Sequence, residues 1–316
     1  MHSRHFLAGI ALAIASSACF AVLDTTVQYL SAFVPLLMAL WLRYTFQATA
    51  AAAWLLPTRG LRMLHTEHPK FQISRGLLLL VSTGLAFASL KVMPVSEFTA
   101  IVMITPLVIT LISAAFFKQH VGVLRWLLIV GGFVGTLIII RPNHQGFQAA
   151  WLLPLGCVAS NTAFQLLTSK MMRTEDPLTT QFYTGVVGML IASLAMPFVF
   201  VWLDNPKLWA LLLLMGVASS AGHFMLIKAY QKAATATLMP YLYAQIAFAL
   251  LGGWLVFRYV PDGWSMLGMA LIGACGALSA WLTVLESKTS PHPSDASPHT
   301  PALAASPAPA AAQQTR

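Results

Sequence analysis

Ten stretches of this chain are apolar enough and long enough to cross a lipid bilayer, and they follow one another almost without a break from Phe6 to Leu285. A helix rises about 1.5 Å per residue against a hydrocarbon core of about 30 Å, so about 17–25 residues suffice for one crossing. Unbroken apolar runs with internal glycines indicate helices and not the alternating strands of an outer-membrane barrel. The sequence therefore predicts an all-α integral membrane protein with ten transmembrane helices. The predicted spans are Phe6–Leu23, Phe33–Leu56, Gly76–Leu90, Val95–Phe117, Leu124–Ile140, Ala149–Leu167, Leu178–Leu203, Leu208–Ile227, Thr235–Phe257 and Trp264–Leu285.

The composition excludes a soluble globular protein. Hydrophobic residues make up 58% of the 316 residues and charged residues only 9%, whereas soluble domains are about 45–50% apolar. The net charge of +9 needs no nucleic-acid partner, because cytoplasmic loops that face anionic lipid account for it. The three cysteines lie within spans without metal or redox spacing, so we expect no metal and no cofactor.

The loop charges divide unevenly between the two sides of the predicted bundle. With a cytoplasmic amino terminus, the inner side holds 13 of the 18 basic residues and the outer side four, while Arg43 lies inside the second span. The inner set is Arg4, Arg59, Arg62, Lys70, Arg75, Lys118, Arg125, Lys170, Arg173, Lys228, Lys232, Lys288 and Arg316, and the outer set is Lys91, Arg141, Lys207 and Arg258. Cytoplasmic loops carry the excess of Lys and Arg, so the division predicts a multi-pass protein of the inner (plasma) membrane with both termini cytoplasmic.

The chain divides into two similar halves. Five predicted spans precede the polar link around Arg141–Gln148 and five follow it, so the second half enters the membrane with the opposite orientation. Shifting the chain on itself by about 140 residues aligns Lys91–Phe117 with Gln231–Phe257. We therefore expect two inverted five-helix repeats, followed by a Pro- and Ala-rich tail that cannot bury a core. The expected units are 1–141 and 142–286 for the repeats and 287–316 for a disordered cytoplasmic tail.

Segments in both halves resemble EamA-type members of the drug/metabolite transporter superfamily. The first half contains PVSEFTAIVMITPLVITLISAAFF at Pro94–Phe117 and GGFVGTLIIIRP at Gly131–Pro142. The second half contains AATATLMPYLYAQIAFALLGGWLVF at Ala233–Phe257, followed by VPDGWSMLG at Val260–Gly268. Arg43 in LWLRYTF also stands where that family commonly has an arginine. The resemblance covers essentially residues 6–285.

The resemblance implies a secondary transporter that works by alternating access. Its substrate site is expected near the bilayer midplane between the repeats, lined by parts of helices one, three, four, six, eight and nine. The family's usual Gly-Glu at the ends of the fourth and ninth helices is replaced by Lys118-Gln119 and Arg258-Tyr259. A role of those glutamates in pairing or coupling is therefore not transferred to this chain.

Three ionisable residues within or at the ends of spans are candidates for substrate binding. Charged groups inside a membrane are costly and usually mark a pathway or a pair. Arg43 could bind an anionic group of the substrate, or it could pair structurally with Asp24 or Glu97. Asp24 and Glu97 could bind a coupling proton or the substrate, or they could be ordinary interfacial carboxylates. For Glu97, the favourable charge in the first turn of a helix supports the second interpretation.

Six further polar residues are candidates, each with a structural alternative. Asn161 and Gln165 share one face of the sixth helix at i, i+4, where they could bind one ligand or hold helices together. Tyr241, Tyr243 and Gln245 gather on the ninth helix and would suit a planar or amphipathic metabolite, although aromatic residues are also common at membrane interfaces.

His223, the sixth of these residues, stands alone on the eighth helix. It has no second ligand at metal spacing, so a hydrogen-bonded core histidine is the alternative to a substrate ligand.

The sequence excludes one class of transporter and favours another. The chain has no phosphate-binding G-x-x-x-x-G-K-[ST] loop, so transport driven by its own ATP hydrolysis is excluded. We expect a carrier for a small molecule and no enzyme. With Asp24 in LDTTVQYL, the first helix looks like that of members that import riboflavin or S-adenosylmethionine, although Gln28 replaces a frequent lysine. Amino-acid or drug export is an alternative, and an intramembrane enzyme or a channel is an alternative from another class. The expected partners are the substrate, the bilayer, a coupling proton or exchange substrate, and a second copy of the chain in a homodimer.

Overall fold

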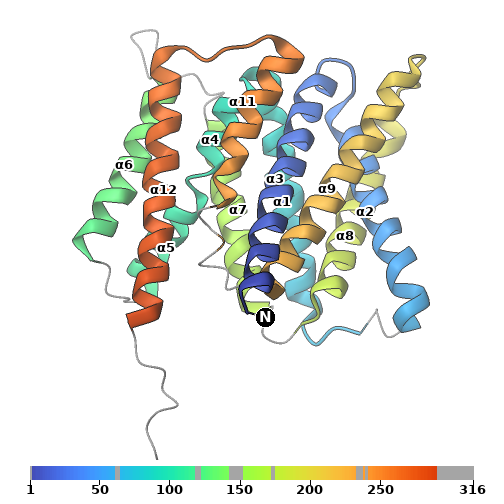
Figure 1. Cartoon of the computed structure of the whole chain (residues 1–316). Helices are drawn as coiled ribbons and strands as arrows, with labels where there is room; N and C mark the ends of the chain where they lie inside the picture. Colours follow the sequence, from blue (N-terminus) through green and yellow to red (C-terminus); the bar gives the residue numbers. More distant parts are fainter. Residues whose placement is uncertain are drawn as a thin grey trace, which may run out of the picture.

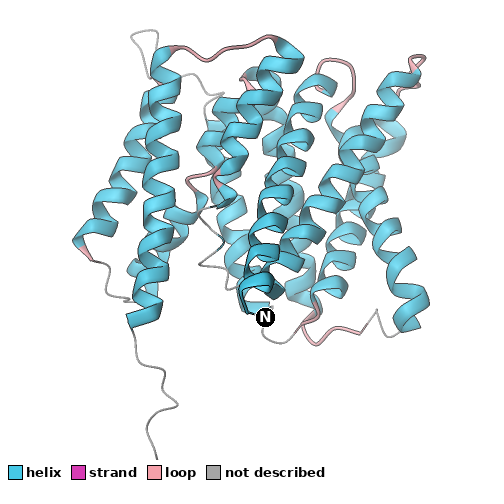
Figure 2. Cartoon of the chain, in the orientation of Figure 1, coloured by secondary structure: helices cyan, strands magenta, loops and turns pink. Residues whose placement is uncertain are grey.

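The computed structural model describes residues 2–60, 65–117, 122–141, 152–171, 175–232, 238 and 241–289, and the regular structure there is entirely helical (Figures 1 and 2). This confirms the all-α prediction for the described residues. The helices are α1 (His2–Leu30), α2 (Leu36–Arg59), α3 (Pro69–Val92), α4 (Val95–Val102), α5 (Thr105–Phe117), α6 (Val123–Ile140), α7 (Leu152–Met171), α8 (Pro177–Val199), α9 (Pro206–Lys232), α11 (Ala244–Phe257) and α12 (Gly263–Thr289). Lys118-Gln119, the link at 142–151 and the tail from 290 lie outside the described residues.

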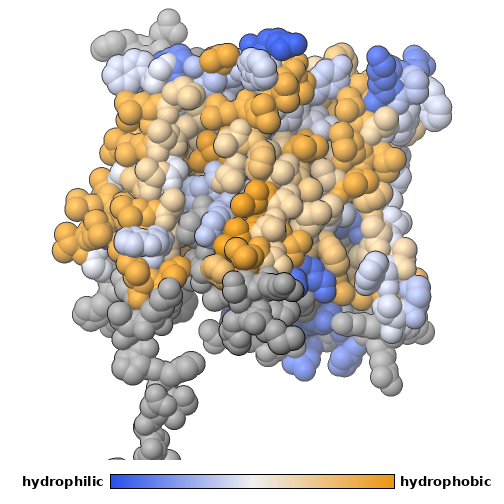
Figure 3. All heavy atoms as spheres, viewed as in Figure 1, coloured by the Kyte–Doolittle hydropathy of each residue, from blue (hydrophilic) through white to orange (hydrophobic). Residues whose placement is uncertain are grey.

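Most of these helices have the length and composition of membrane spans. Among the residues that the structure describes, seven spans are long and apolar enough to cross a membrane: α1, α3, α4 with α5, α6, α8, α9 and α12. The apolar helices α7 and α11 are shorter, and in α2 polar residues such as Arg43 and Gln47 reduce the mean hydropathy. Figure 3 shows the consequence on one face, where hydrophobic residues cover the middle of the bundle and hydrophilic residues gather at its two ends. The chain is an integral membrane protein.

Two predicted boundaries are wrong in ways that matter for function. The sequence places Asp24 at the end of the first span, but α1 continues to Leu30. The hydroxyls of Thr25 and Thr26 donate to the carbonyls four residues back, both at 2.7 Å, so these residues are accommodated within the helix. The sequence also assigns Arg75 to a cytoplasmic loop, whereas it lies inside α3 and is buried.

The fourth predicted span is broken into two helices. Pro106 has no N–H to donate to the carbonyl of Val102, the last residue of α4, and its ring would clash with that carbonyl in a continuous helix. The hydroxyl of Thr105 donates to the freed carbonyl at 2.6 Å. The chain therefore turns at Met103 and Ile104 and resumes as α5, which leaves α4 as a short helix deep in the bundle.

Glycines let α6 and α12 approach until their backbones touch. A Cβ added to Gly135 would lie 2.9 Å from the carbonyl oxygen of Gly268, and one added to Gly268 would lie 2.7 Å from the carbonyl oxygen of Gly135. Close contact between small residues is a common way for membrane helices to associate. This contact joins the last helix of the first half to the last helix of the second.

Gly135→Ala is expected to destabilise the protein by about 1–3 kcal/mol, because the added methyl group must push two helix backbones apart. Thermal unfolding of the purified protein, followed by tryptophan fluorescence, measures the effect. Gly122→Ala is the matched control, since a Cβ there meets nothing within 4 Å. An unchanged melting temperature for Gly135→Ala would contradict the close packing.

Candidate functional site

A polar cluster lies inside the bundle where α1, α4 and α11 meet. Asp24 Oδ2 accepts a hydrogen bond from Gln245 Nε2 at 3.2 Å, and Thr99 Oγ1 lies 3.5 Å from the same oxygen. Thr99 and Gln245 are both buried. Gln245 is the second residue of α11, directly after the turn at Tyr243. The carboxylate of Asp24 is therefore held by neutral donors from both halves of the chain.

Arg43 lies on α2, seven residues from its start, at a depth of about 10 Å by the helical rise. Its side chain is 5% exposed. Nε donates to Ser219 Oγ on α9 at 3.0 Å and Nη1 donates to Thr83 Oγ1 on α3 at 2.7 Å. The guanidinium carbon lies 5.3 Å from the ring centroid of Tyr44, a cation–π geometry. The side chain thus ties three helices together through uncharged partners.

The charges of Asp24 and Arg43 act on one another without direct contact. The two groups interact electrostatically, yet each has neutral hydrogen-bond partners of its own. We call Asp24, Arg43 and their partners Thr83, Thr99, Ser219 and Gln245 the central cluster. It offers an acceptor and a cation, both of which retain hydrogen-bonding capacity.

His223 lies beside the central cluster on α9. Its Nδ1 is 2.8 Å from the carbonyl oxygen of Ser219, and its ring packs edge-on against Phe20 at a centroid distance of 4.9 Å. These contacts are those expected of a hydrogen-bonded structural histidine, and substrate binding by His223 stays a prediction. In the part of the chain that the structure describes, no group of three or more His, Cys, Asp or Glu side chains is placed to hold a metal ion.

A second buried arginine lies nearer the end of the bundle that holds the amino terminus. Arg75 on α3 is 6% exposed. Its Nε donates to Thr168 Oγ1 on α7 at 2.8 Å, and its Nη1 donates to the carbonyl of Thr180 at 3.1 Å and to the hydroxyl of Thr184, both on α8. Its guanidinium carbon lies 4.6 Å from the ring centroid of Phe164. We call Arg75 and these four residues the Arg75 network.

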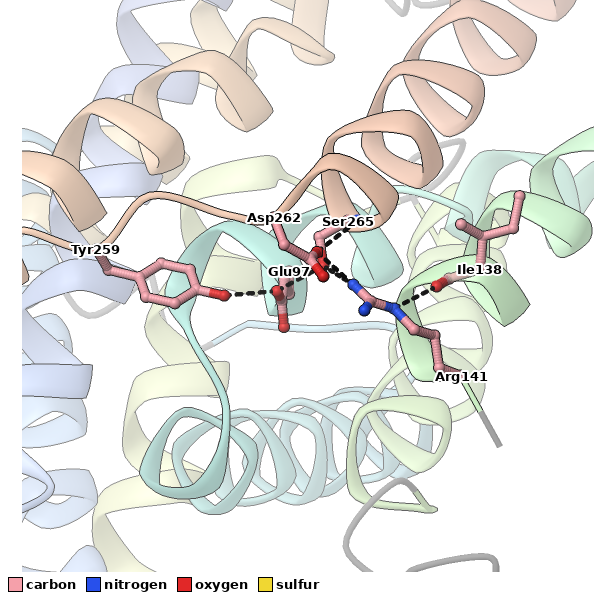
Figure 4. Close-up of polar contacts among 6 residues, drawn as sticks. All are labelled: Glu97, Ile138, Arg141, Tyr259, Asp262 and Ser265. Carbon is pink, nitrogen blue, oxygen red and sulfur yellow. Dashed lines mark hydrogen bonds and ion pairs between the residues drawn. The ribbon is translucent and has the colours of Figure 1, made fainter. Parts of the chain in front are cut away.

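A third group of polar side chains lies at the opposite end of the bundle (Figure 4). Buried Glu97 accepts hydrogen bonds on Oε1 from the hydroxyls of Tyr259 and Ser265, both at 2.8 Å. Arg141 forms an ion pair with Asp262 and donates to Ser265 Oγ at 3.0 Å. We call these five residues the Glu97 network. Glu97 and Arg141 come from the first half of the chain, and the other three come from the second.

The pKa values of Asp262 and Tyr259 keep the contacts of the Glu97 network in place near neutral pH. The hydrogen bond from Arg141 holds the pKa of Asp262 well below its usual range, so the ion pair persists until the pH falls through that lowered pKa. Burial and the hydrogen bond to Glu97 raise the pKa of Tyr259. The phenol therefore stays protonated and donates to Glu97 across the physiological range.

A groove of about 500 Å³ lies between α1, α9 and α11, and its lining is almost entirely apolar. Thr25, Thr26 and Tyr29 of α1 and Phe248 of α11 contribute to it. Such a lining suits lipid chains better than a polar metabolite, so the central cluster is the stronger candidate for substrate binding.

Comparison with known proteins identifies the family. The model of the EamA-like transporter family matches residues 7–141 and again residues 149–281. The chain belongs to the EamA-like transporter family. This confirms the resemblance seen in the sequence.

Relatives of this EamA-like chain include transporters with named substrates. A riboflavin transporter of Vibrio cholerae serotype O1 is 28% identical over 91% of this chain and 96% of its own length. A riboflavin transporter of Rhizobium johnstonii is 30% identical over 89% of each chain. An S-adenosylmethionine uptake transporter of Rickettsia bellii is 26% identical over 67% of this chain and 73% of its own. A solved crystal structure of another protein, at 18% identity, covers 90% of this chain and 99% of its own with a TM-score of 0.64, which shows a shared fold.

The EamA-like fold brings only part of the predicted site together. Asp24, Arg43 and Gln245 meet in the central cluster, whereas Glu97 belongs to the Glu97 network. The predicted alternative of a direct pair between Arg43 and either carboxylate does not describe this structure, because Arg43 donates to hydroxyl groups.

The remaining candidates are dispersed. Tyr241 packs beside Ala13 and Leu238, and Tyr243 lies directly over Gly276 of α12. No described contact joins Asn161 or Gln165 to the central cluster. Whether any of these residues binds substrate stays a prediction.

Two residues of this EamA-like transporter, Arg75 and Gln28, make contacts in the structure that their place in the sequence does not indicate. Arg75 escapes notice because it directly precedes the apolar run and counts as a loop charge. Gln28 Nε2 donates to the carbonyl of Met93 at 3.2 Å, and Gln28 Oε1 accepts from the N–H of Val95 at 3.1 Å. Gln28 thereby fastens α1 to the connection between α3 and α4. Its two-sided hydrogen bonding could not be read from sequence spacing.

Arg43→Gln is expected to reduce substrate uptake about tenfold or more, and Arg43→Lys to keep part of the activity. A charge-assisted hydrogen bond is about twice as strong as a neutral one, and lysine keeps the charge but loses the planar fork. Both variants should insert and purify, because the partners of Arg43 are neutral groups and no carboxylate loses a direct partner. Uptake into cells, normalised to protein in the membrane, measures the effect. Full uptake by Arg43→Gln would remove Arg43 from the site.

Proposed function

We propose that this chain is a secondary carrier that imports a compact heteroaromatic metabolite, with riboflavin the first compound to test. The observation that carries the proposal is the central cluster, where a carboxylate and a guanidinium from the first half meet Ser219 and Gln245 from the second. Both halves thus hold the same buried polar site. The names of the relatives in Vibrio cholerae and Rhizobium johnstonii support riboflavin.

The chemistry of riboflavin suits the central cluster. Its isoalloxazine ring carries an imide, in which one N–H donor stands between two carbonyl acceptors. Asp24 can accept from the N–H, and the unused donors of Arg43 can bind a carbonyl, in the way that polar groups fix orientation in otherwise apolar sites. Such paired recognition disfavours analogues that lack the imide, because buried polar groups would be left unpaired.

The proposed architecture is ten membrane crossings in two inverted repeats, 1–141 and 142–286. The helix contacts support it, because they come in matched pairs under such a symmetry. α1 packs on α9 and α3 on α7, and α3 packs on α8 and α2 on α9. The pairs α2–α8 and α6–α12 join equivalent helices, and the contact between α4 and α11 joins the fourth and ninth predicted spans. A turn interrupts the chain at Met103 and again at Tyr243, about 140 residues later, as repeats would require.

This arrangement suits alternating access. The Glu97 network connects the halves at one end of the bundle, and contacts at the other end connect them again. There Glu175 Oε1 accepts from Thr66 Oγ1 at 2.7 Å and from the N–H of His68 at 2.9 Å. A carrier must open these two connections in turn while it holds the substrate between them.

The decisive experiment is counterflow in liposomes. Purified protein is reconstituted, the vesicles are loaded with unlabelled riboflavin, and labelled riboflavin is added outside. A carrier gives saturable uptake with a transient overshoot that needs no ATP. A linear, non-saturating flux would indicate a channel, and chemical conversion of the substrate would indicate an enzyme. Overshoot with S-adenosylmethionine in place of riboflavin would keep the carrier but change the substrate.

Both termini are expected to be cytoplasmic in the inner (plasma) membrane, because the predicted inner loops carry most of the basic residues. The start of α1 and the end of α12 lie at the same end of the bundle (Figure 1), as an even number of crossings requires. Alkaline phosphatase fused after Lys288 should be inactive in cells, and fused within the link at 142–148 it should be active. The opposite pattern would overturn the orientation.

A further inference from the structure

The surroundings of Arg75 hold its guanidinium in place without neutralising it. Thr168 Oγ1 donates its hydrogen to the carbonyl of Phe164 at 2.6 Å, and Thr184 Oγ1 donates to the carbonyl of Thr180 at 2.8 Å. Each hydroxyl therefore turns a lone pair toward Arg75. With the carbonyl of Thr180 and the ring of Phe164, four uncharged groups fix the side chain.

Some hydrogen-bond donors of the Arg75 guanidinium are not used within the described part of the protein. A guanidinium has five N–H donors, and the three on Nε and Nη1 are used. In the part of the chain that the structure describes, Nη2 has no hydrogen-bond partner. A donor pair of this kind matches the oxygens of a carboxylate or a phosphate group.

No carboxylate of the described residues directly compensates Arg75. Glu175, the buried acid at the same end of the bundle, accepts hydrogen bonds from Thr66 and from the backbone of His68. Asp24 belongs to the central cluster, and Glu97 lies in its own network at the opposite end (Figure 4). Charges inside membrane proteins usually pair or mark a substrate path, and the neutral surroundings of Arg75 favour the path.

Arg75 and Arg43 each lie against an aromatic ring of one buried cluster. Tyr44, beside Arg43, and Phe164, beside Arg75, belong to the same buried cluster, together with Leu79. Both arginine charges act on Tyr44. The same arrangement therefore occurs at two places in the bundle. In each, a guanidinium lies on an aromatic ring, donates to hydroxyl groups and keeps unused donors. Arg43 forms it in the central cluster, and Arg75 forms it nearer the end that holds the amino terminus.

We propose that Arg75 is a second binding position on the transport path and takes a phosphate or carboxylate group of the substrate. The inference rests on the proposed carrier function and narrows its substrate class. A molecule whose ring lies in the central cluster would place its anionic group against Arg75. As the substrate moves from the central cluster toward the end that holds the amino terminus, its phosphate or carboxylate group would bind Arg75.

Two matched pairs of compounds test the proposal on the purified full-length protein. Riboflavin 5′-phosphate differs from riboflavin by a phosphate group, and S-adenosylmethionine differs from its decarboxylated form by a carboxylate. Flavin fluorescence titration measures the first pair, and ligand-induced shifts of the melting temperature measure the second. We expect the wild type to prefer the member that carries the phosphate or carboxylate by about tenfold or more in at least one pair.

Arg75→Gln should remove that preference and leave the affinity for the member without the phosphate or carboxylate within about twofold. Lys170→Gln is the matched control, because it removes one positive charge from an exposed side chain on α7 and should leave the preference unchanged. Thr168→Val provides a second variant in case Arg75→Gln does not fold. It keeps the charge but loses one of the hydroxyls that fix it, and it should reduce the preference.

The outcomes separate this inference from the carrier function. Loss of preference in Arg75→Gln with the phosphate pair supports a phosphate position, and with the carboxylate pair a carboxylate position. An unchanged preference in both Arg75→Gln and Thr168→Val overturns the proposal. A wild type that prefers the phosphate- or carboxylate-bearing member of neither pair also overturns it. If that protein still transports riboflavin, the carrier function survives, and if it binds none of the four compounds, the proposed substrate class fails as well.

Discussion

Asp24→Asn is expected to reduce substrate uptake about a hundredfold, the scale on which a buried charge-assisted contact acts, while leaving the protein folded in the membrane. Asparagine has the shape of aspartate, and its carbonyl oxygen can still accept from Gln245 and Thr99. What it loses is the negative charge that offsets Arg43 and that can accept strongly from an N–H of the substrate. Uptake into cells and binding to purified protein should fall together, since the change affects the site itself.

Asp204→Asn is the matched control for this result. It makes the same chemical change at an exposed position directly before α9, outside the central cluster, and should leave uptake unchanged. Near-normal uptake by Asp24→Asn would show that the carboxylate is a structural acceptor only. A variant that is absent from the membrane would instead assign Asp24 to folding, and binding by the small purified fraction would then decide its role.

The sequence predicts the helices well because a single strong physical constraint dictates them. In hydrocarbon every backbone polar group must be satisfied internally, so long apolar runs become helices. The residue at which such a helix ends is harder to predict. Thr25 and Thr26 look like a boundary in the sequence, yet their hydroxyls bond within α1 and let it continue past Asp24. The break between α4 and α5 follows from Pro106, because a proline inside an apolar run indicates a kink in the helix.

The site is harder to predict, because a polar residue in a span has partners that only packing determines. Gln245 reaches Asp24 across 221 positions of sequence, and no spacing rule indicates such a contact. Tyr241 and Tyr243 are two residues apart and near Gln245, yet they contact different helices because the chain turns there. Arg75 shows the opposite error: a residue at the edge of an apolar run is counted with the loops, although α3 begins six residues earlier.

Cross-linking the Glu97 network is expected to stop transport almost completely. The hydrogen bonds of Tyr259 and Ser265 to Glu97, and the contacts of Arg141 with Ser265 and Asp262, all join the first half of the chain to the second. If the halves must separate at this end to admit substrate, a covalent bridge holds the carrier in one state. Cysteines at positions 141 and 262, introduced as Arg141→Cys with Asp262→Cys, place two thiols where the ion pair stands.

A short bifunctional methanethiosulfonate then joins the two thiols, in a background where Cys19, Cys157 and Cys275 are replaced by alanine. Uptake should fall to below about a tenth of the untreated value, because the transport cycle cannot proceed unless this end of the bundle opens. Uptake should recover when the disulfides of the cross-link are reduced. The two single-cysteine variants, treated in the same way, should keep transporting. Removing the ion pair without a bridge should not block transport, since an exposed pair contributes little and Tyr259 and Ser265 still contact Glu97. Normal uptake by the bridged protein would mean that this end of the bundle does not open during transport, and the Glu97 network would then be a fixed structural contact.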